Sequence, residues 1–378
     1  MIRTDVSPFD RHMMEIALRM ARRGLGRTRP NPSVGAVIAD ERSDEVLARS
    51  VTAPGGRPHA ETEAIAVAGE RARGATIYVT LEPCAHHGQT APCADAIIAA
   101  GLSRVVAAIE DADPRVAGRG LDRLRAAGLA VTRGVLASEA RWVTRGHIVR
   151  VTERRPLVTL KMALNAGGDI ARGGAGQPQW LTGDLARARG WLLRAEADAI
   201  LVGAQTVRDD DPMLTCRLPG LADRSPVRIV LSRDLDVPLT SRLVQSARNV
   251  PVWIITSHKA PAARRLALID AGVDVIDATE VQNQLWLPSV MEALVARGVT
   301  RLLVEGGPTV WRAFADAALV DEVALFMAAR PDRPQTETEA HGAITRWLGS
   351  LPLSLDDVMD VAMDRLWRFR RRSTTEGA

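Results

Sequence analysis

Two short stretches, PHAETEA at 58–64 and TLEPCAHHGQTAPC at 80–93, decide how the first part of the chain is interpreted. They contain one histidine, His59, and two cysteines, Cys84 and Cys93, and these side chains are of the types that bind zinc. A structural zinc site takes four protein ligands, whereas three ligands leave one tetrahedral position open for water. The three residues therefore predict a catalytic zinc site, with one zinc ion per chain.

Glu61 follows His59 by two residues, and its carboxylate is predicted to be catalytic. Beside an activated water it can accept a proton and later deliver that proton to a leaving amine. A lone histidine or cysteine would more often be an ordinary core or surface residue. The order H-x-E followed by P-C, however, matches the signature of zinc-dependent deaminases, with eight residues instead of two between the cysteines.

The longer spacing points to one branch of these deaminases. PCAHHGQTAPC at 83–93 resembles the PCSHxGRTPPC segment of the deaminase domain in the bifunctional deaminase–reductases of bacterial riboflavin biosynthesis. RPNPSVGAVI at 29–38 and DADPRVAGRGLDRLRAAGL at 111–129 resemble the same domain, so the resemblance covers most of residues 10–150. The chain also lacks the histidine that this family usually carries shortly before HAE. Within the cysteine segment it departs from the family pattern at Ala85, Gln89 and Ala91.

The resemblance implies a small-molecule substrate, a phosphoribosylaminopyrimidine. The reaction would be hydrolytic deamination of 2,5-diamino-6-(5-phosphoribosylamino)pyrimidin-4(3H)-one to 5-amino-6-(5-phosphoribosylamino)uracil, with the zinc ligands and Glu61 as above. Asn31 either reads the pyrimidine base or only forms an Asn-Pro turn. His86 and His87 either contact the substrate or are structural loop residues. The departures from the family pattern concern these substrate contacts and leave the metal chemistry intact.

The order of expected elements predicts the α/β class, because strand-like and helix-like segments alternate along the whole chain. The basic, proline-ended VTERRP is the expected linker, so the boundary is placed between domains 1–153 and 154–378. The family resemblance implies a cytidine-deaminase-like three-layer domain followed by a dihydrofolate-reductase-like domain.

The second half resembles the NADPH-dependent reductase of the same family, which converts the ribosyl side chain to ribityl. The matching segments are LKMAL at 160–164, PQWLT at 178–182, LRAEADAILVGAQTVRDDDPMLTCR at 193–217 and LLVEGGPTV at 302–310. Small residues between a strand and a helix let backbone N–H groups approach a pyrophosphate. The resemblance implies a catalytic Lys161 and substrate contacts from Arg194, Arg217 and Glu305. It implies an NADPH site lined by Ala163, Trp180, Thr206, Asp210, Ser232, Gly307, Pro308 and Thr309.

Several positions in this half depart from the family pattern. Its Ser-x-Asp-Gly after the lysine reads Asn165 to Gly168, the serine before QW is Pro178, and the segment after residue 327 differs throughout. An alternative is therefore an active deaminase whose second domain is only structural. Arg233, after the strand VRIVLS, either favours the 2′-phosphate of NADP or is an ordinary cation at a strand end.

Composition limits the remaining classes. A chain of 378 residues predicts two domains, and 46% apolar with 25% charged residues is typical of globular proteins. The net charge of +4 leaves a nucleic-acid (tRNA) deaminase as a second alternative, but arginines interspersed with acids indicate a solvated surface, so no nucleic-acid partner is expected. The sequence shows no membrane span and no secretory signal, and it has only three cysteines, so we expect a cytoplasmic protein. We expect it to form a homo-oligomer, a dimer or a tetramer.

Overall fold

The computed structural model describes residues 6–86, 91–170, 181–329 and 335–372. Internal contacts divide the chain into two units, Met1–Pro156 and Leu157–Ala378. The predicted boundary after residue 153 coincides with the end of helix α5 (Ala137–Glu153). No helix among the described residues is both long and apolar enough to cross a membrane.

The first unit is built on a five-stranded sheet of order β2-β1-β3-β4-β5. β1 is antiparallel to both of its neighbours, whereas β3, β4 and β5 run parallel. The segments that follow β3 and β4 therefore leave the sheet at the same edge. The strands are β1 (Gly35–Asp40), β2 (Glu45–Val51), β3 (Thr76–Val79), β4 (Arg104–Ala107) and β5 (Ala130–Arg133).

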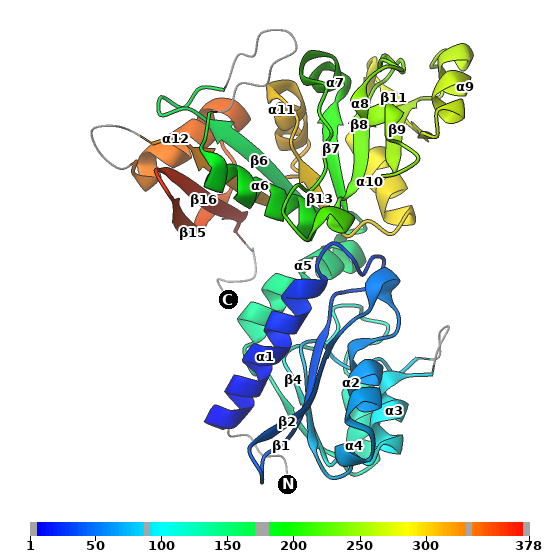
Figure 1. Cartoon of the computed structure of the whole chain (residues 1–378), viewed down its shortest axis with the longest axis vertical. Coiled ribbons are helices and arrows are strands. Elements are labelled where there is room, and N and C mark those ends of the chain that lie inside the picture. The colour runs from blue at the N-terminus through cyan, green and yellow to red at the C-terminus, as the bar shows by residue number, and fades with distance from the viewer. Residues whose placement is uncertain (1–5, 87–90, 171–180, 330–334, 373–378) are drawn as a thin grey trace. The chain divides into compact units, whose positions relative to one another are not determined.

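Helices cover both faces of this sheet and make three layers (Figure 1). α1 and α5 lie on one face, and α2, α3 and α4 lie on the other. α1 buries an apolar stripe that includes Met14, Ala17, Leu18 and Ala21, at the spacing of one helix face. Gly35 lets β1 approach it, because a Cβ there would lie 1.9 Å from the carbonyl oxygen of Ala17. The elements are α1 (Pro8–Gly24), η1 (Pro54–Gly56), α2 (Ala60–Ala68), η2 (Gly69–Ala72), α3 (Cys93–Ala99) and α4 (Arg119–Ala126).

The second unit contains a nine-stranded sheet of order β10-β9-β8-β7-β13-β6-β14-β16-β15. The strands from β10 to β14 in this order are parallel, and β16 and β15 are antiparallel to their neighbours. The strands are β6 (Leu157–Leu164), β7 (Ala199–Gly203), β8 (Val227–Leu231), β9 (Val252–Ser257), β10 (Asp274–Ala278), β13 (Arg301–Val304), β14 (Glu322–Met327), β15 (Leu353–Val361) and β16 (Asp364–Arg371), and a separate hairpin pairs β11 (Glu280–Val281) with β12 (Gln284–Leu285).

Two apolar layers cover this sheet. One face of the sheet is covered by α10, α11 and α12. The other face is covered by α8, α9 and the apolar side of α6 that carries Ala186 and Leu193. The central parallel strands β6, β13 and β7 end side by side, and a crevice outside the carboxyl ends of such strands is where open α/β sheets bind ligands. The helices are α6 (Asp184–Glu196), α7 (Ala204–Asp210), η3 (Ala222–Arg224), α8 (Arg242–Gln245), α9 (Ala262–Asp270), α10 (Leu287–Ala296), α11 (Pro308–Asp316) and α12 (Glu337–Leu348).

Asp364, the first residue of β16, ties two distant segments of this unit together. Its Oδ2 accepts the backbone N–H of Gly183, just before α6, at 2.6 Å. Its Oδ1 accepts the N–H of Ala329, just after β14, at 3.4 Å. The Asp364 carboxylate is buried, whereas Gly183 is exposed, so the two bonds are only partly shielded from water. The C-terminal hairpin therefore holds two earlier segments of the chain. Gly183 lies 181 residues before Asp364, and Ala329 lies 35 residues before it.

Candidate active sites

The structure brings His59, Cys84 and Cys93 together. Their ligand atoms all lie within 4.8 Å of one another, and among the described residues no other group of His, Cys, Asp and Glu is placed to hold a metal ion. His59 Nδ1 lies 3.2 Å from Cys93 Sγ and 3.7 Å from Cys84 Sγ. His59 directly precedes α2, Cys93 opens α3, and Cys84 lies in the segment that follows β3.

Local charges favour a cation at this point. The backbone N–H of Cys93, at the start of α3, donates to Cys84 Sγ at 3.3 Å. Hydrogen bonding from Cys93 and from His59 lowers the pKa of the Cys84 thiol to about 4, whereas the pKa of Cys93 is raised by its bond to Cys84 and by burial. Two sulfurs this close repel each other as thiolates unless a cation lies between them. One imidazole and two thiolates are the donor set that zinc takes at a site with one open position, so the residues fit this metal.

Glu61 lies in the first turn of α2 and is 3% exposed. Burial raises the pKa of its carboxyl to about 7, against the attraction of His59. A carboxyl group with a pKa near neutrality can both accept and release a proton. Glu61 therefore lies beside the candidate metal ligands with a pKa that suits acid–base chemistry.

Glu82, two residues before Cys84, binds the segment from Asp111 to Leu121, which the sequence did not indicate. Its buried carboxylate accepts the backbone N–H groups of Asp111 at 3.1 Å, Gly118 at 2.9 Å and Gly120 at 2.8 Å. A Cβ on Gly120 would lie 1.9 Å from the carbonyl oxygen of Pro83. The segment after β4 and the start of α4 are thereby held against the residues that lead into Cys84. An acid between a strand and a Pro-Cys pair is the one signal that could have suggested this role.

Asn31 was expected either to read the pyrimidine base or only to form an Asn-Pro turn, and in the structure it forms a turn. The N–H of Asn31 donates to Thr28 O at 2.9 Å, and its side-chain amide donates to Gly56 O at 2.8 Å. This contact joins the Asn-Pro segment to the loop that leads to His59. His86 is exposed in the loop after Cys84, and His87 lies outside the described residues. Substrate contacts by these residues stay predictions.

In the second unit, the structure brings Lys161, Arg194 and Glu305 together. Arg194 donates from Nε to Glu305 Oε1 at 2.8 Å and from Nη2 to Oε2 at 2.9 Å. Lys161 Nζ lies 3.9 Å from the same Oε2 and 5.8 Å from the ring centre of Phe326. Lys161 comes from β6, Arg194 from α6, and Glu305 follows β13. The ion pairs thus join a helix to two neighbouring strands of the sheet.

The charges of this cluster shift one another. Burial alone would raise the pKa of Glu305, but Arg194 and Lys161 hold it at about 2, so the carboxylate stays ionised. Burial lowers the pKa of the Lys161 ammonium, and Glu305 opposes that shift. An ammonium group with a lowered pKa gives up its proton more readily than an ordinary lysine.

The two arginines expected at the substrate differ in their surroundings. Arg194 uses Nη1 on the carbonyl oxygen of Thr215, at 2.9 Å, in addition to its two bonds to Glu305. Its contact with a substrate phosphate stays a prediction, and the structure gives it a role in fixing Glu305. Arg217 is exposed at the surface. The pKa of its guanidinium is nevertheless lowered, by desolvation of the part that is covered and by repulsion from Arg194 and Arg242. Arg242, which the sequence did not single out, therefore joins a group of cations that suits a phosphate.

The turn before α11 fits the phosphates of a dinucleotide. Gly307 precedes α11, and a Cβ added to it would meet no atom of the described residues within 4 Å. At Gly306 a Cβ would lie 2.7 Å from Val310 Cβ, so only glycine allows the helix to pack this closely. α7 begins at the end of β7, which pairs with β13, so two helix N-termini lie on adjacent strands. The first N–H groups of a helix have no acceptor within that helix and can bind an anion.

Comparison with known proteins agrees with both units. Residues 7–109 match the cytidine and deoxycytidylate deaminase zinc-binding region, and residues 156–330 match the RibD C-terminal domain. The riboflavin biosynthesis protein RibD of Aquifex aeolicus is 37% identical over 325 residues, which cover 86% of this chain and 88% of that protein. The chain belongs to the RibD family.

Solved RibD structures extend this likeness to the fold. Acinetobacter baumannii RibD superposes with a TM-score of 0.80 at 30% identity, over 97% of this chain and 99% of that one. A Thermotoga maritima protein described as a diaminohydroxyphosphoribosylaminopyrimidine deaminase/5-amino-6-(5-phosphoribosylamino)uracil reductase gives 0.79 at 32% identity, over 96% and 99%. The predicted fold class, a cytidine-deaminase-like domain followed by the reductase domain, is confirmed. The chain is a riboflavin-biosynthesis protein with deaminase and reductase domains, and the comparisons favour neither alternative function.

One departure from the RibD pattern is compensated in the structure. Asn165 Oδ1 accepts the N–H groups of Gly167 at 2.8 Å and Asp169 at 2.9 Å, so it closes the turn after β6. From α12, Trp347 Nε1 donates to Gly168 O at 2.9 Å. The turn is therefore held on both sides although its sequence has changed.

The other described residues expected to contact NADPH in a RibD reductase come from β6, from the segment after β8, and from α7 and α11. Ser232 follows β8, and its hydroxyl accepts the N–H of Asp236 at 2.8 Å. Asp210 ends α7, and its pKa is raised by burial and by Asp209. Trp180 and Pro178 lie outside the described residues. Of the others, β6 carries Ala163, α7 carries Thr206, and the start of α11 carries Pro308 and Thr309.

Proposed function

We propose that the first unit deaminates 2,5-diamino-6-(5-phosphoribosylamino)pyrimidin-4(3H)-one with one bound zinc ion, and that the second unit reduces the ribosyl side chain of the product with NADPH. The observation that carries the proposal is the convergence of three zinc-type donors within 4.8 Å beside the buried carboxyl group of Glu61. The description of the Thermotoga maritima relative names the same two activities.

In the deaminase, His59, Cys84 and Cys93 would hold the zinc ion. Zinc supplies Lewis-acid chemistry and makes hydroxide available from water near neutral pH. Glu61 accepts a proton from the attacking water and returns a proton to the departing nitrogen. A C–O bond forms at the pyrimidine carbon, the C–N bond breaks, and ammonia leaves. The burial that raises the pKa of Glu61 suits both proton transfers.

In the reductase, NADPH supplies a hydride. Reduction of the ribosyl carbon attached to nitrogen would break its bond to the ring oxygen, and the ring oxygen would need a proton to become a hydroxyl. Lys161 Nζ is the group proposed to give this proton, since burial lowers its pKa. Glu305 orients the ammonium group, and Arg194 fixes Glu305. Arg217 and its neighbouring cations would bind the substrate phosphate by charge-assisted hydrogen bonds.

Other expectations stay predictions from the sequence: cytoplasmic location, assembly as a dimer or tetramer, and the individual residues that contact substrate and NADPH.

One experiment on the intact chain tests both halves. The purified protein should release ammonia from the diaminopyrimidine ribotide and then oxidise NADPH. Glu61→Gln should abolish both signals with that substrate, yet oxidise NADPH normally when the aminouracil ribotide is supplied. If ammonia is released but NADPH is neither bound nor consumed with either compound, the second unit is structural and the reductase half of the proposal fails.

A further inference from the structure

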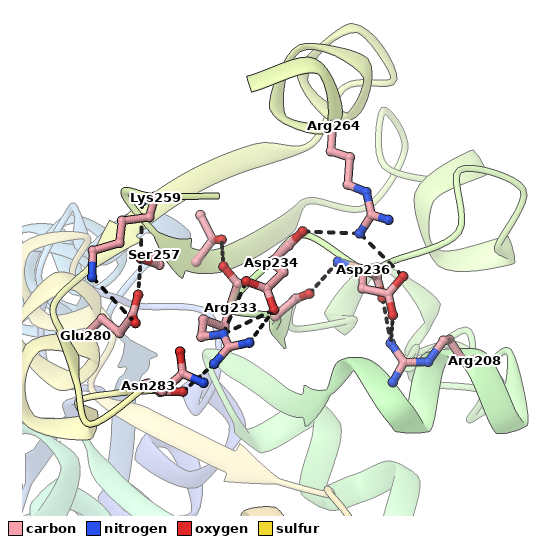
Figure 2. A network of polar contacts seen from close by, with 11 residues as sticks. Arg208, Arg233, Asp234, Asp236, Ser257, Lys259, Arg264, Glu280 and Asn283 are labelled. Atoms are coloured by element: carbon pink, nitrogen blue, oxygen red, sulfur yellow. Dashed lines mark hydrogen bonds and ion pairs between the residues drawn. The ribbon is translucent and has the colours of Figure 1, made fainter. Parts of the chain in front are cut away.

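A network of charged residues lies at the carboxyl ends of β8 and β9 (Figure 2). It contains four cationic side chains and three carboxylates, linked by ion pairs. Its members are Arg208, Arg233, Lys259 and Arg264 together with Asp234, Asp236 and Glu280. Exposed ion pairs contribute little to stability, so the density of this network calls for another explanation.

Arg233 has a fixed position next to the proposed NADPH site. Its carbonyl oxygen accepts the hydroxyl of Thr256 at 2.7 Å and the N–H of Ser257 at 3.2 Å, which ties its backbone to β9. β8, which it follows, pairs with β7, where Leu231 lies opposite Gly203 at the start of α7. From the turn at the end of β13 to the end of β8 is two strand spacings, about 10 Å. A dinucleotide whose phosphates lie at the helix N-termini can therefore extend its adenosine toward Arg233.

The partners of Arg233 differ in how easily they can be displaced. Its Nη1 donates to the carbonyl oxygen of Asn283 at 2.6 Å (Figure 2). Asp234 accepts from its Nη2 at 2.7 Å and from its Nε at 3.1 and 3.2 Å, and all three bonds are made to one exposed carboxylate. The Asp234 side chain is 55% exposed, against 32% for Arg233. Asp234 can therefore turn to solvent at small cost while Asn283 keeps the guanidinium in place. Arg233 is therefore a cation held in place by Asn283, and its anionic partner Asp234 can be replaced by another anion.

Glu280 lies near the same cation and is firmly held. Its carboxylate accepts the Ser257 hydroxyl at 2.6 Å, lies 3.7 Å from Lys259 Nζ and is 10% exposed. The pKa of Arg233 is raised first by its bond to Asp234 and, further, by the charge of Glu280, which places Glu280 within electrostatic range. In dinucleotide-binding sheets an arginine at such a strand end accommodates the 2′-phosphate of NADP, and an acid there binds the 2′-hydroxyl of NAD.

Resting on the proposed use of NADPH, we propose that Arg233, Asp234 and Glu280 together set the preference of the reductase unit for NADPH over NADH. Arg233 binds the 2′-phosphate when Asp234 turns away, and Glu280 acts in the opposite sense by favouring an unphosphorylated ribose. The preference for NADPH over NADH is then smaller than Arg233 alone would give. The substitution Asp234→Asn increases this preference.

Direct binding of two nucleotide fragments to the full-length protein tests this, without catalysis. Adenosine 2′,5′-bisphosphate carries the extra phosphate, and adenosine 5′-monophosphate lacks it. By titration calorimetry at low salt, Arg233→Ala should weaken binding of the bisphosphate about tenfold, the effect of one lost charge-assisted hydrogen bond, and leave the monophosphate within about twofold. Asp234→Asn should tighten the bisphosphate severalfold.

Arg365→Ala is the matched control. Arg365 also pairs with one exposed aspartate, Asp360, at 2.7 Å and with one backbone carbonyl, that of Gln335, at 2.9 Å, but it lies on β16. It should change neither affinity. Equal weakening of both fragments by Arg233→Ala, or no gain from Asp234→Asn, would overturn the proposal. If the unaltered chain binds neither fragment nor NADPH, the cofactor proposal itself fails, and this inference fails with it.

Discussion

Arg194 and Glu305 meet through two parallel hydrogen bonds, from Nε to Oε1 at 2.8 Å and from Nη2 to Oε2 at 2.9 Å, across 111 positions of the sequence. Both side chains are largely buried, at 14% and 10% exposed. Because the pair joins α6 to the segment after β13, it serves the fold of the second unit as well as its site. Removing one partner of such a pair leaves the other charge buried without compensation.

Arg194→Leu should therefore lower the free energy of unfolding of the second unit by about 3 kcal/mol. Seven of the eight tryptophans lie in this unit, so tryptophan fluorescence during urea unfolding follows it almost alone. Arg346→Leu removes a pair between exposed side chains, at 55% and 64%, and should cost less than about 1 kcal/mol. Equal losses from the two variants would show that the Arg194 pair has no special weight.

The same cluster predicts a dependence of stability on pH. Its neighbours hold the pKa of Glu305 at about 2 in the folded chain, below its usual 4.5. The unfolded chain therefore binds this proton first, so the stabilisation is complete above about pH 5 and disappears as the pH falls toward 2, with a total of about 3 kcal/mol. Urea unfolding at several acidic pH values should show this slope, and Glu305→Gln should flatten it. An unchanged slope in the variant would assign the acid sensitivity to other carboxylates.

Metal analysis should distinguish the three cysteines. Cys84→Ala and Cys93→Ala should each lose the zinc ion, because two remaining protein ligands hold it poorly. Cys216→Ala should keep about one zinc per chain, since Cys216 is buried in the second unit and belongs to no group of metal-type donors among the described residues. Full zinc content in the Cys84 variant would refute the proposed site.

Alanine substitutions at two helical glycines should have opposite effects on stability. Gly120→Ala should destabilise the first unit and weaken zinc binding, because its Cβ would lie 1.9 Å from Pro83 O, next to Cys84. Gly342→Ala in α12 meets no atom within 4 Å and should stabilise the second unit by about 0.5 to 1 kcal/mol. Zinc content and thermal unfolding measure both effects. A Gly120 variant as stable as the parent would mean that the loop from 111 to 121 moves freely.

The sequence pointed to His59, Cys84 and Cys93 as one group, and the structure brings them together. Their role as zinc ligands stays a prediction. The group could be found because its residues lie at the boundaries of strongly patterned elements. His59 and Cys93 each lie where a helix begins, and such boundaries are marked locally by the chain. The role of Glu82 was missed since its partners lie 29 to 39 positions away, and only the folded chain brings their N–H groups to the carboxylate. For the same reason the sequence pointed to Arg194 and Glu305 as separate substrate contacts and did not indicate that they bind each other.

The C-terminal basic run shows a different limit. RLWRFRRR at 365–372 has five arginines in eight residues, which by composition suggests a solvated charged segment, but it forms most of β16, between β14 and β15. Its apolar residues Leu366, Trp367 and Phe369 are buried, so the segment is part of the core. The arginines among them conceal this apolar pattern in the sequence. Asn165 shows that a changed motif can keep its backbone function, because its amide oxygen closes the turn.

The position of Asp364 has a consequence for how the protein is made. Every residue expected at the reductase site precedes residue 310, yet the segments at Gly183 and Ala329 are tied together only when Asp364 has left the ribosome. N-terminal domains generally fold first during synthesis, so the deaminase unit is complete long before its companion. A premature stop codon or a proteolytic cut shortly before Asp364 would therefore uncouple the two steps. Such a chain would still release ammonia, and the aminouracil ribotide would accumulate unreduced.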